Sequence, residues 1–284
     1  MARRLFFFAA YDPLEGVGPA LEWYIKALVP YGEIICIMSN RCPEKELEKL
    51  KPYCLHVASM PHNEAYFGSH MRAYKWAVAN LDISEYTHLY MMDNSVLGPT
   101  EDLGPVFKKL ESYGIEVYGM SFDNSNFSPY LHTWFFGMNM SIVMTPWFKR
   151  YITTIHREAP DEDMDMRYAM AFSRLIVDRG CDLDAIYNLN RPGFYDPFFR
   201  KEAFTYHDGT KGYRLRVIFD SMSEECRQVM IDECMRTLGE DYFCWLMRRE
   251  PWLMLRRSWR YHRNKGKERK DYYVPPIRPM TKKP

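Results

Sequence analysis

The sequence lacks the short motifs that mark several large protein classes. It contains neither G-x-G-x-x-G nor G-x-x-x-x-G-K, which counts against dinucleotide-dependent enzymes and P-loop kinases. Its seven cysteines are scattered, with no C-x-x-C pair and no Cys/His cluster at zinc spacing, so we expect reduced thiols in a cytosolic protein. No apolar run approaches the roughly 18–20 residues that cross a bilayer. The apolar start ends at Tyr11-Asp12-Pro13, and we interpret it as a first strand rather than a signal peptide.

Charge is nearly balanced overall but distributed unevenly along the chain. Residues 248–284 hold 13 Lys/Arg against 3 Asp/Glu, a balance of +10. Of the chain's 38 Lys/Arg and 37 Asp/Glu, this leaves 25 and 34 for residues 1–247, a balance of −9. Such asymmetry indicates that the basic end meets an anionic partner.

Strand-like and helix-like segments alternate up to residue 145. This alternation predicts an α/β fold, a mostly parallel sheet flanked by helices. The expected strands are 5–9, 34–38, 55–58, 88–92 and 116–120, and the expected helices are 19–28, 44–51, 68–80, 103–113, 147–156 and 165–178. Paired or kinked strands are expected over 134–144, and further helices over 223–238 and 242–261.

The most informative segment is the apolar run 88–92, which leads directly into Asp93-Asn94-Ser95 and a Gly-Pro break. Open α/β sheets bind their ligands at the carboxyl ends of inner strands, which is where these polar residues are expected. Tyr11 and Asp12 end the first expected strand in the same way. In both places a simple turn is an equally good interpretation, because Asp, Asn and Ser all favour turns.

Four blocks in this order resemble the rhamnan synthesis protein F family of rhamnosyltransferases, which have a GT-A-like fold. They are Phe8-Ala-Ala-Tyr-Asp-Pro13, the helix with Ala73-Tyr74-Lys75, the block His88–Pro99, and Tyr130-Leu-His-Thr-Trp-Phe135. The resemblance covers roughly residues 5–190. It implies a GT-A-like nucleotide-sugar glycosyltransferase domain over 1–190. An aromatic-rich, helical extension over 191–263 and a basic Pro/Lys-rich tail over 264–284, expected to be disordered, would follow.

The resemblance also implies a reaction and its partners. The chain would transfer L-rhamnose or a related deoxyhexose, with inversion, from a dTDP- or UDP-linked donor to a growing glycan. Acceptor glycans in this family are commonly lipid-linked. Tyr11, Asp12, Asp93, Asn94 and Ser95 would contact the nucleotide sugar. Asp93 is the candidate ligand for a Mn²⁺ or Mg²⁺ ion at the diphosphate.

Two further groups complete the candidate site. Arg72 and Lys75 lie three residues apart on one expected helix and would neutralise the diphosphate, unless they are simply solvated surface charges. An inverting transferase needs a base within hydrogen-bond reach of the acceptor hydroxyl. The candidate bases are Asp123, Asp163 and His132.

The chain departs from the family pattern at contact positions. The family's Asn-Asp-Ser is Asp93-Asn94-Ser95 here, its Asp-Phe-Gly is His70-Met71-Arg72, and its Gln is His132. The Glu that the family has before Gly180 has no counterpart here. These changes keep open a second hypothesis, a catalytically inactive glycosyltransferase-like protein that binds glycans or assembles with partners.

The basic segment 248–270 interleaves arginines with tryptophans and leucines. Such a helix suits the surface of an anionic membrane, and no motif supports nucleic acid as the partner instead. We therefore expect a cytoplasmic protein lying against the cytoplasmic face of the membrane.

Overall fold

The computed structural model describes residues 2–12, 15–94, 96–97, 99, 102–112, 114–123, 130–159, 164–188 and 213–214. The helices expected over 223–238 and 242–261 and the basic tail lie outside the described residues. The strands are β1 Arg4–Ala10, β2 Gly32–Met38, β3 His56–Ser59, β4 His88–Asp93, β5 Val96–Leu97, β6 Val117–Asp123, β7 Tyr130–Leu131, β8 Phe135–Asn139, β9 Leu183–Asn188 and β10 Tyr213–Arg214. The main helices are α1 Pro19–Leu28, α2 Glu44–Leu47, α3 Ala65–Asn80, α4 Gly104–Glu111, α5 Met140–Val143, α6 Pro146–Thr153, the π-helix Asp165–Met170 and α7 Ala171–Asp178.

Eight strands form one sheet in the order β3-β2-β1-β4-β8-β6-β7, with β9 also pairing with β6. The first four strands are parallel, β8 is antiparallel to both β4 and β6, and β9 is parallel to β6. The carboxyl ends of β1, β2, β3, β4 and β6 therefore meet at one edge, which we call the carboxyl edge. The predicted α/β class, a mostly parallel sheet flanked by helices, is confirmed.

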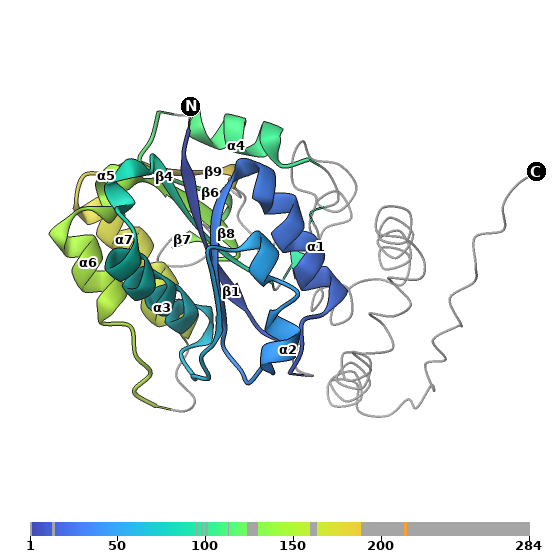
Figure 1. The fold of residues 1–284 in the computed structure, drawn as a ribbon. Helices are drawn as coiled ribbons and strands as arrows, with labels where there is room; N and C mark the ends of the chain where they lie inside the picture. Colours follow the sequence, from blue (N-terminus) through green and yellow to red (C-terminus); the bar gives the residue numbers. More distant parts are fainter. Residues whose placement is uncertain are drawn as a thin grey trace, which may run out of the picture.

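Helices cover both faces of the sheet (Figure 1). One core joins Phe6 and Phe8 of β1 to α1, α2 and α4, and the other joins Leu5 and Phe7 to α3, α5, α6 and α7. Strands buried on both faces are typical of parallel sheets, and they account for the continuous apolar run in β1. The described residues include no helix with the length and apolar character of a membrane span.

Two expected elements differ in the structure. The helix expected over 44–51 ends at Leu47, and a 3₁₀ turn follows at Lys51–Tyr53. After Leu47 the turns tighten, because the Lys49 N–H donates to the Glu46 carbonyl at 3.2 Å and the Leu50 N–H to the Leu47 carbonyl at 2.9 Å. Pro52 then has no N–H with which to continue an α-helix. The segment expected as paired or kinked strands over 134–144 forms β8 and then α5, since β8 runs out of partner at Asn139, opposite His88 where β4 begins.

Candidate functional site

The polar residues predicted from the sequence meet where the strand order reverses. The connection from β1 to β2 runs through α1 on one face, whereas the connection from β3 to β4 runs through α3 on the other. The carboxyl ends of β1 and β4 therefore separate two oppositely directed crossovers, with Ala9 paired to Asp93. Such a switch point is where open α/β sheets bind their ligands.

Asp93 is the last residue of β4, and only 4% of its surface is exposed. Its backbone N–H donates to the Trp134 carbonyl at 3.2 Å, which ties the end of β4 to the start of β8. The side chain lies close enough to Tyr24 of α1 to affect its ionisation. Burial is the main cause that raises the pKa of Tyr24 well above its usual value, and the negative charge of Asp93 adds to it. Asp93 is thus a buried carboxylate at the carboxyl end of β4, beside Tyr24 of α1.

Asn94 binds the backbone of Tyr11 through both atoms of its side-chain amide. The Tyr11 N–H donates to Asn94 Oδ1 at 3.1 Å, and Asn94 Nδ2 donates to the Tyr11 carbonyl at 2.8 Å. The Tyr11 side chain is 55% exposed. The end of β4 therefore holds an exposed aromatic ring at the carboxyl edge.

Asn40, which follows β2, makes the same pair of bonds to Asp12. Its Nδ2 donates to the Asp12 carbonyl at 2.5 Å, and its Oδ1 accepts the Asp12 N–H at 3.4 Å. Sequence reasoning missed Asn40, although it follows an expected strand just as Asp93 and Tyr11 do. The rule that selected those residues, applied to the strand over 34–38, would have found it.

His70 of α3 lies beneath the end of β4. Its Nε2 donates to the Met92 carbonyl at 2.9 Å, and the residue is wholly buried. Burial lowers the pKa of His70 to about 4, the Met92 carbonyl partly opposes this, and the nearby His62 adds to it. The imidazole is therefore neutral near pH 7 and braces the residue that precedes Asp93.

A polar cluster closes the start of α3. His62 Nε2 lies 2.9 Å from Ser69 Oγ, and His62 Nδ1 lies 3.0 Å from Glu64 Oε2. The connectivity is that of a Ser-His-Glu triad, but Ser69 is only 1% exposed, so its hydroxyl cannot reach a substrate. The cluster is a brace for the loop between β3 and α3.

Arg72 belongs to this cluster. Its Nη1 donates to Glu64 Oε2 at 3.2 Å and to the Gly68 carbonyl at 2.9 Å. Lys75 lies five residues after His70 in α3 and is exposed, whereas His70 is buried against β4. The structure thus gives Arg72 a partner within α3 and its preceding loop, and leaves Lys75 on an exposed face of the helix.

The base candidates differ in what the structure describes. Asp123 ends β6, whose direction matches that of β4, so its backbone lies at the same carboxyl edge. His132 is 5% exposed, its backbone N–H donates to the Ser121 carbonyl at 2.9 Å, and its imidazole ring stacks on the Tyr130 ring. Ser95 and Asp163 lie outside the described residues.

The segment expected as an extension contributes two residues next to the site. Tyr213 and Arg214 of β10 pair antiparallel with Leu97 and Val96 of β5. Since β5 begins three residues after Asp93, β10 lies against the segment that leaves the candidate site. Trp23 of α1 donates its Nε1–H to the Pro99 carbonyl at 2.9 Å on the far side of β5 along the chain.

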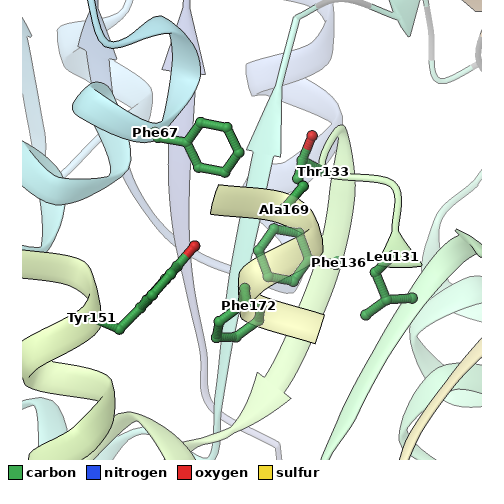
Figure 2. A pocket seen from close by; sticks show the side chains of 7 residues that line it. All are labelled: Phe67, Leu131, Thr133, Phe136, Tyr151, Ala169 and Phe172. Carbon is green, nitrogen blue, oxygen red and sulfur yellow. The ribbon is translucent and has the colours of Figure 1, made fainter. Parts of the chain in front are cut away.

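An aromatic hollow lies next to the site, beneath the start of α3. Figure 2 shows the rings of Phe67, Phe136, Tyr151 and Phe172 around it, together with Leu131, Thr133 and Ala169. The hollow has no room for a water molecule. It is a packing seam between α3, α6 and α7, and not a binding pocket.

The donor set for a divalent cation is small. The described part of the chain contains no cluster of three or more His, Cys, Asp or Glu side chains arranged to hold a metal. Asp93 supplies one carboxylate, whereas both amide atoms of the neighbouring Asn94 are engaged by Tyr11. A magnesium ion bound to substrate phosphates commonly uses only one or two carboxylates, so Asp93 fits such an ion when the substrate supplies the other oxygens.

No family model matches the sequence, and no curated protein matches it. Among solved structures, S. aureus TarS residues 1–349 is 11% identical with a TM-score of 0.45, covering 94% of this chain and 74% of that one. A cytidylyltransferase from Leptospira borgpetersenii is 10% identical with a TM-score of 0.42, covering 89% and 97%. A glycosyltransferase involved in glycosylation of the PBCV-1 major capsid is 11% identical with a TM-score of 0.38, covering 81% and 99%. These identities and TM-scores are low, so the function must be argued from the chain's own residues.

Proposed function

We propose that the chain is a glycosyltransferase that uses a nucleotide diphosphate sugar. The observation that carries this is the exposed Tyr11 ring, held beside the buried Asp93 at the point where the strand order reverses. An aromatic face next to polar main-chain and carboxylate groups suits a nucleobase and its ribose. The absence of a Gly-rich phosphate loop favours a nucleotide sugar over a dinucleotide or ATP.

In this proposal Tyr11 stacks on the base, Asp12 lies at the ribose, and Asp93 faces the diphosphate. A Mg²⁺ or Mn²⁺ ion, bound by Asp93 and the diphosphate oxygens, would offset the charge of the leaving group. Arg72 is the less suited of the two predicted cations, because its guanidinium already binds Glu64. Lys75 is exposed on α3 and is the cation that the sequence resemblance favours, so it remains the candidate for neutralising the diphosphate.

For the base we favour Asp123. The strands β4 and β6 are two strand spacings apart across β8, about 10 Å, which leaves room for a sugar between Asp93 and Asp123. The acceptor hydroxyl oxygen attacks the anomeric carbon, and the bond from that carbon to the diphosphate breaks with its electron pair. The hydroxyl proton passes to the Asp123 carboxylate, and attack from the opposite face inverts the anomeric carbon. We prefer Asp123 to His132, because Asp123 ends a strand whose carboxyl end lies at the same edge of the sheet as Asp93.

The finer assignments remain proposals that follow from the sequence resemblance. They are an L-rhamnose or related deoxyhexose donor linked to dTDP or UDP, a growing glycan as the acceptor, and a lipid-linked acceptor at an anionic membrane reached through residues 248–270. The last of these rests on the +10 balance of residues 248–284.

The test is donor turnover across a nucleotide-sugar panel that includes dTDP- and UDP-rhamnose, with Mg²⁺, Mn²⁺ or EDTA. Selective release of one nucleotide that depends on Asp93 would support a transferase and name its donor. Full turnover in excess EDTA would remove the metal from the proposal. Absence of both binding and turnover for every donor would refute the proposal and favour a non-catalytic glycan-binding protein.

A further inference from the structure

The two asparagines that follow β2 and β4 continue the hydrogen-bond ladder of β1 beyond its last residue. In a strand, the N–H and C=O of one residue point to one neighbouring strand, and those of the next residue point to the other. The Ala9 carbonyl accepts from Asn94 N on the β4 side, and the Ala10 carbonyl accepts from Ser39 N on the β2 side. The next two residues keep this alternation with side chains as partners, and the Asp12 carbonyl also accepts the Glu15 N–H at 3.0 Å.

The side-chain amide of Asn94 takes the place of a backbone neighbour for Tyr11. It accepts the Tyr11 N–H at 3.1 Å and donates to the Tyr11 carbonyl at 2.8 Å. On the β2 side, Asn40 does the same for Asp12, at 3.4 Å and 2.5 Å. Asparagine suits this role because its amide carries one acceptor and one donor group, as a peptide unit does.

We infer that Asn40 and Asn94 are positioning residues that hold Tyr11 and Asp12 in an extended conformation, with the Tyr11 ring presented for stacking on a nucleobase. The inference deepens the proposed function and rests on it for the identity of the ligand. It assigns a role to Asn40 and changes that of Asn94, whose amide atoms are engaged by the protein. An ordered loop binds more tightly because less conformational freedom is lost on binding.

The geometry also explains how the two residues after β1, which ends at Ala10 opposite Met38 of β2, are held in place. An unpaired strand end leaves N–H and C=O groups without fixed partners, and it frays. Here each of these groups on Tyr11 and Asp12 has a side-chain partner from an adjacent strand. The exposed ring is thereby carried on a backbone whose N–H and C=O groups are hydrogen-bonded.

The test uses the full chain and the variants Asn40→Ala and Asn94→Ala. The matched control is Asn139→Ala, because Asn139 Nδ2 donates to the Ile115 carbonyl at the opposite edge of the sheet. The hydrogen-exchange rates of the Tyr11 and Asp12 backbone amides measure directly whether the asparagine side chains protect them. We expect exchange at Tyr11 to accelerate at least about tenfold in Asn94→Ala, and at Asp12 in Asn40→Ala, with no change in the control.

Affinity for UDP and dTDP, measured by calorimetry, shows whether Asn40 and Asn94 contribute to nucleotide binding. Loss of the side-chain amide of Asn40 or of Asn94 should weaken nucleotide binding about tenfold. It should also raise the KM for the donor more than it lowers kcat. In a Tyr11→Ala background, Asn94→Ala should have no further effect on affinity, because the residue acts through Tyr11.

The outcomes separate the two claims. Unchanged exchange at Tyr11 and Asp12 would show that the two asparagines do not hold these residues. Faster exchange with wild-type nucleotide affinity would show that holding them does not contribute to nucleotide binding. An Asn94→Ala effect that persists fully in the Tyr11→Ala background would show that Asn94 does not act through Tyr11. If the wild-type chain binds neither nucleotide, the proposed function and the nucleotide part of the inference both fail. The exchange data would then still decide whether Asn40 and Asn94 hold Tyr11 and Asp12 in place.

Discussion

His70 donates its Nε2–H to the carbonyl of Met92 at 2.9 Å, which joins the buried face of α3 to the residue before Asp93. A neutral imidazole can make this bond inside the protein without the cost of burying a charge. The peptide unit between Met92 and Asp93 is therefore held at its carbonyl by His70 of α3 and at its N–H by the Trp134 carbonyl.

This contact predicts a loss of stability in mild acid. The unfolded imidazole keeps a pKa near 6.5, whereas the pKa of folded His70 is about 4, so between these values the unfolded state binds more protons. The free energy of unfolding should therefore fall as the pH decreases from 6.5 to 4, by up to about 3 kcal/mol for this residue. Urea denaturation at several pH values measures it.

The variant His70→Gln separates this residue from the others. Its amide can still donate to Met92, but it does not titrate, so the decrease between pH 6.5 and 4 should become smaller. Some decrease should remain, because burial also lowers the pKa of His62 to about 4, with Arg72 adding and Glu64 opposing. An identical pH dependence in His70→Gln would show that His70 is not the group responsible.

Asp93→Asn should remove donor turnover while leaving the fold intact. The amide has the same size, but it lacks the charge that the proposal assigns to the diphosphate end, so we expect a decrease in kcat of at least about a hundredfold. Asp178→Asn is the control, because Asp178 ends α7 with a 64% exposed side chain. Turnover that survives Asp93→Asn would exclude Asp93 from the chemistry.

Gly68→Ala should destabilise the protein although alanine favours helices. A Cβ at Gly68 would lie 2.7 Å from atoms of both His62 and Glu64, and the buried imidazole has little room to move. We expect a cost of about 1–3 kcal/mol against a helix preference of about 1 kcal/mol. Denaturation of Gly68→Ala and of the same variant with His62→Ala tests the clash, since loss of the ring should recover part of the stability. A Gly68→Ala variant at least as stable as wild type would contradict it.

At the edge of the sheet where the parallel strands begin, opposite the carboxyl edge, the substitution Glu111→Gln should affect stability alone. Arg4 binds Glu111 through two bonds of 2.5 Å and 2.7 Å, and the Tyr90 hydroxyl donates to the same carboxylate at 2.9 Å. Both charged side chains are mostly buried, so Glu111→Gln should cost about 2–4 kcal/mol by leaving Arg4 without its counter-charge. Nucleotide affinity, measured well below the melting temperature, should stay at the wild-type value because the pair lies at the edge opposite Asp93. A matched loss of affinity would show that the two edges are coupled.

Deletion of residues 248–284 should abolish binding to vesicles. This removes the +10 balance that we assign to an anionic membrane, and each basic residue near such a surface contributes about 1 kcal/mol. Co-sedimentation with phosphatidylserine-containing vesicles is the measurement, and neutral phosphatidylcholine vesicles are the control. Equal binding of the full and shortened chains would refute the membrane proposal.

The class of the fold could be predicted from the sequence, and so could the polar residues that end its inner strands. The alternation of apolar runs with helical periodicity predicted β1, β2, β4, α1 and α3 closely, because strands buried on two faces and helices buried on one leave different periods. The same reasoning placed Tyr11, Asp12, Asp93 and Asn94 at strand ends, where a parallel sheet gathers them.

Which residues contact one another depends on packing between elements. Arg72 and Lys75 share a helix, but helical spacing carries no information on the pairing of Arg72 with Glu64. The strand-end rule could have named Asn40, but its bonds to Asp12 exist because β2 lies beside β1, a pairing between distant segments. The insertion of antiparallel β8 between β4 and β6, and the pairing of β10 with β5, likewise depend on long-range contacts. Local periodicity fixes which face of an element is buried, whereas packing between elements fixes its neighbours.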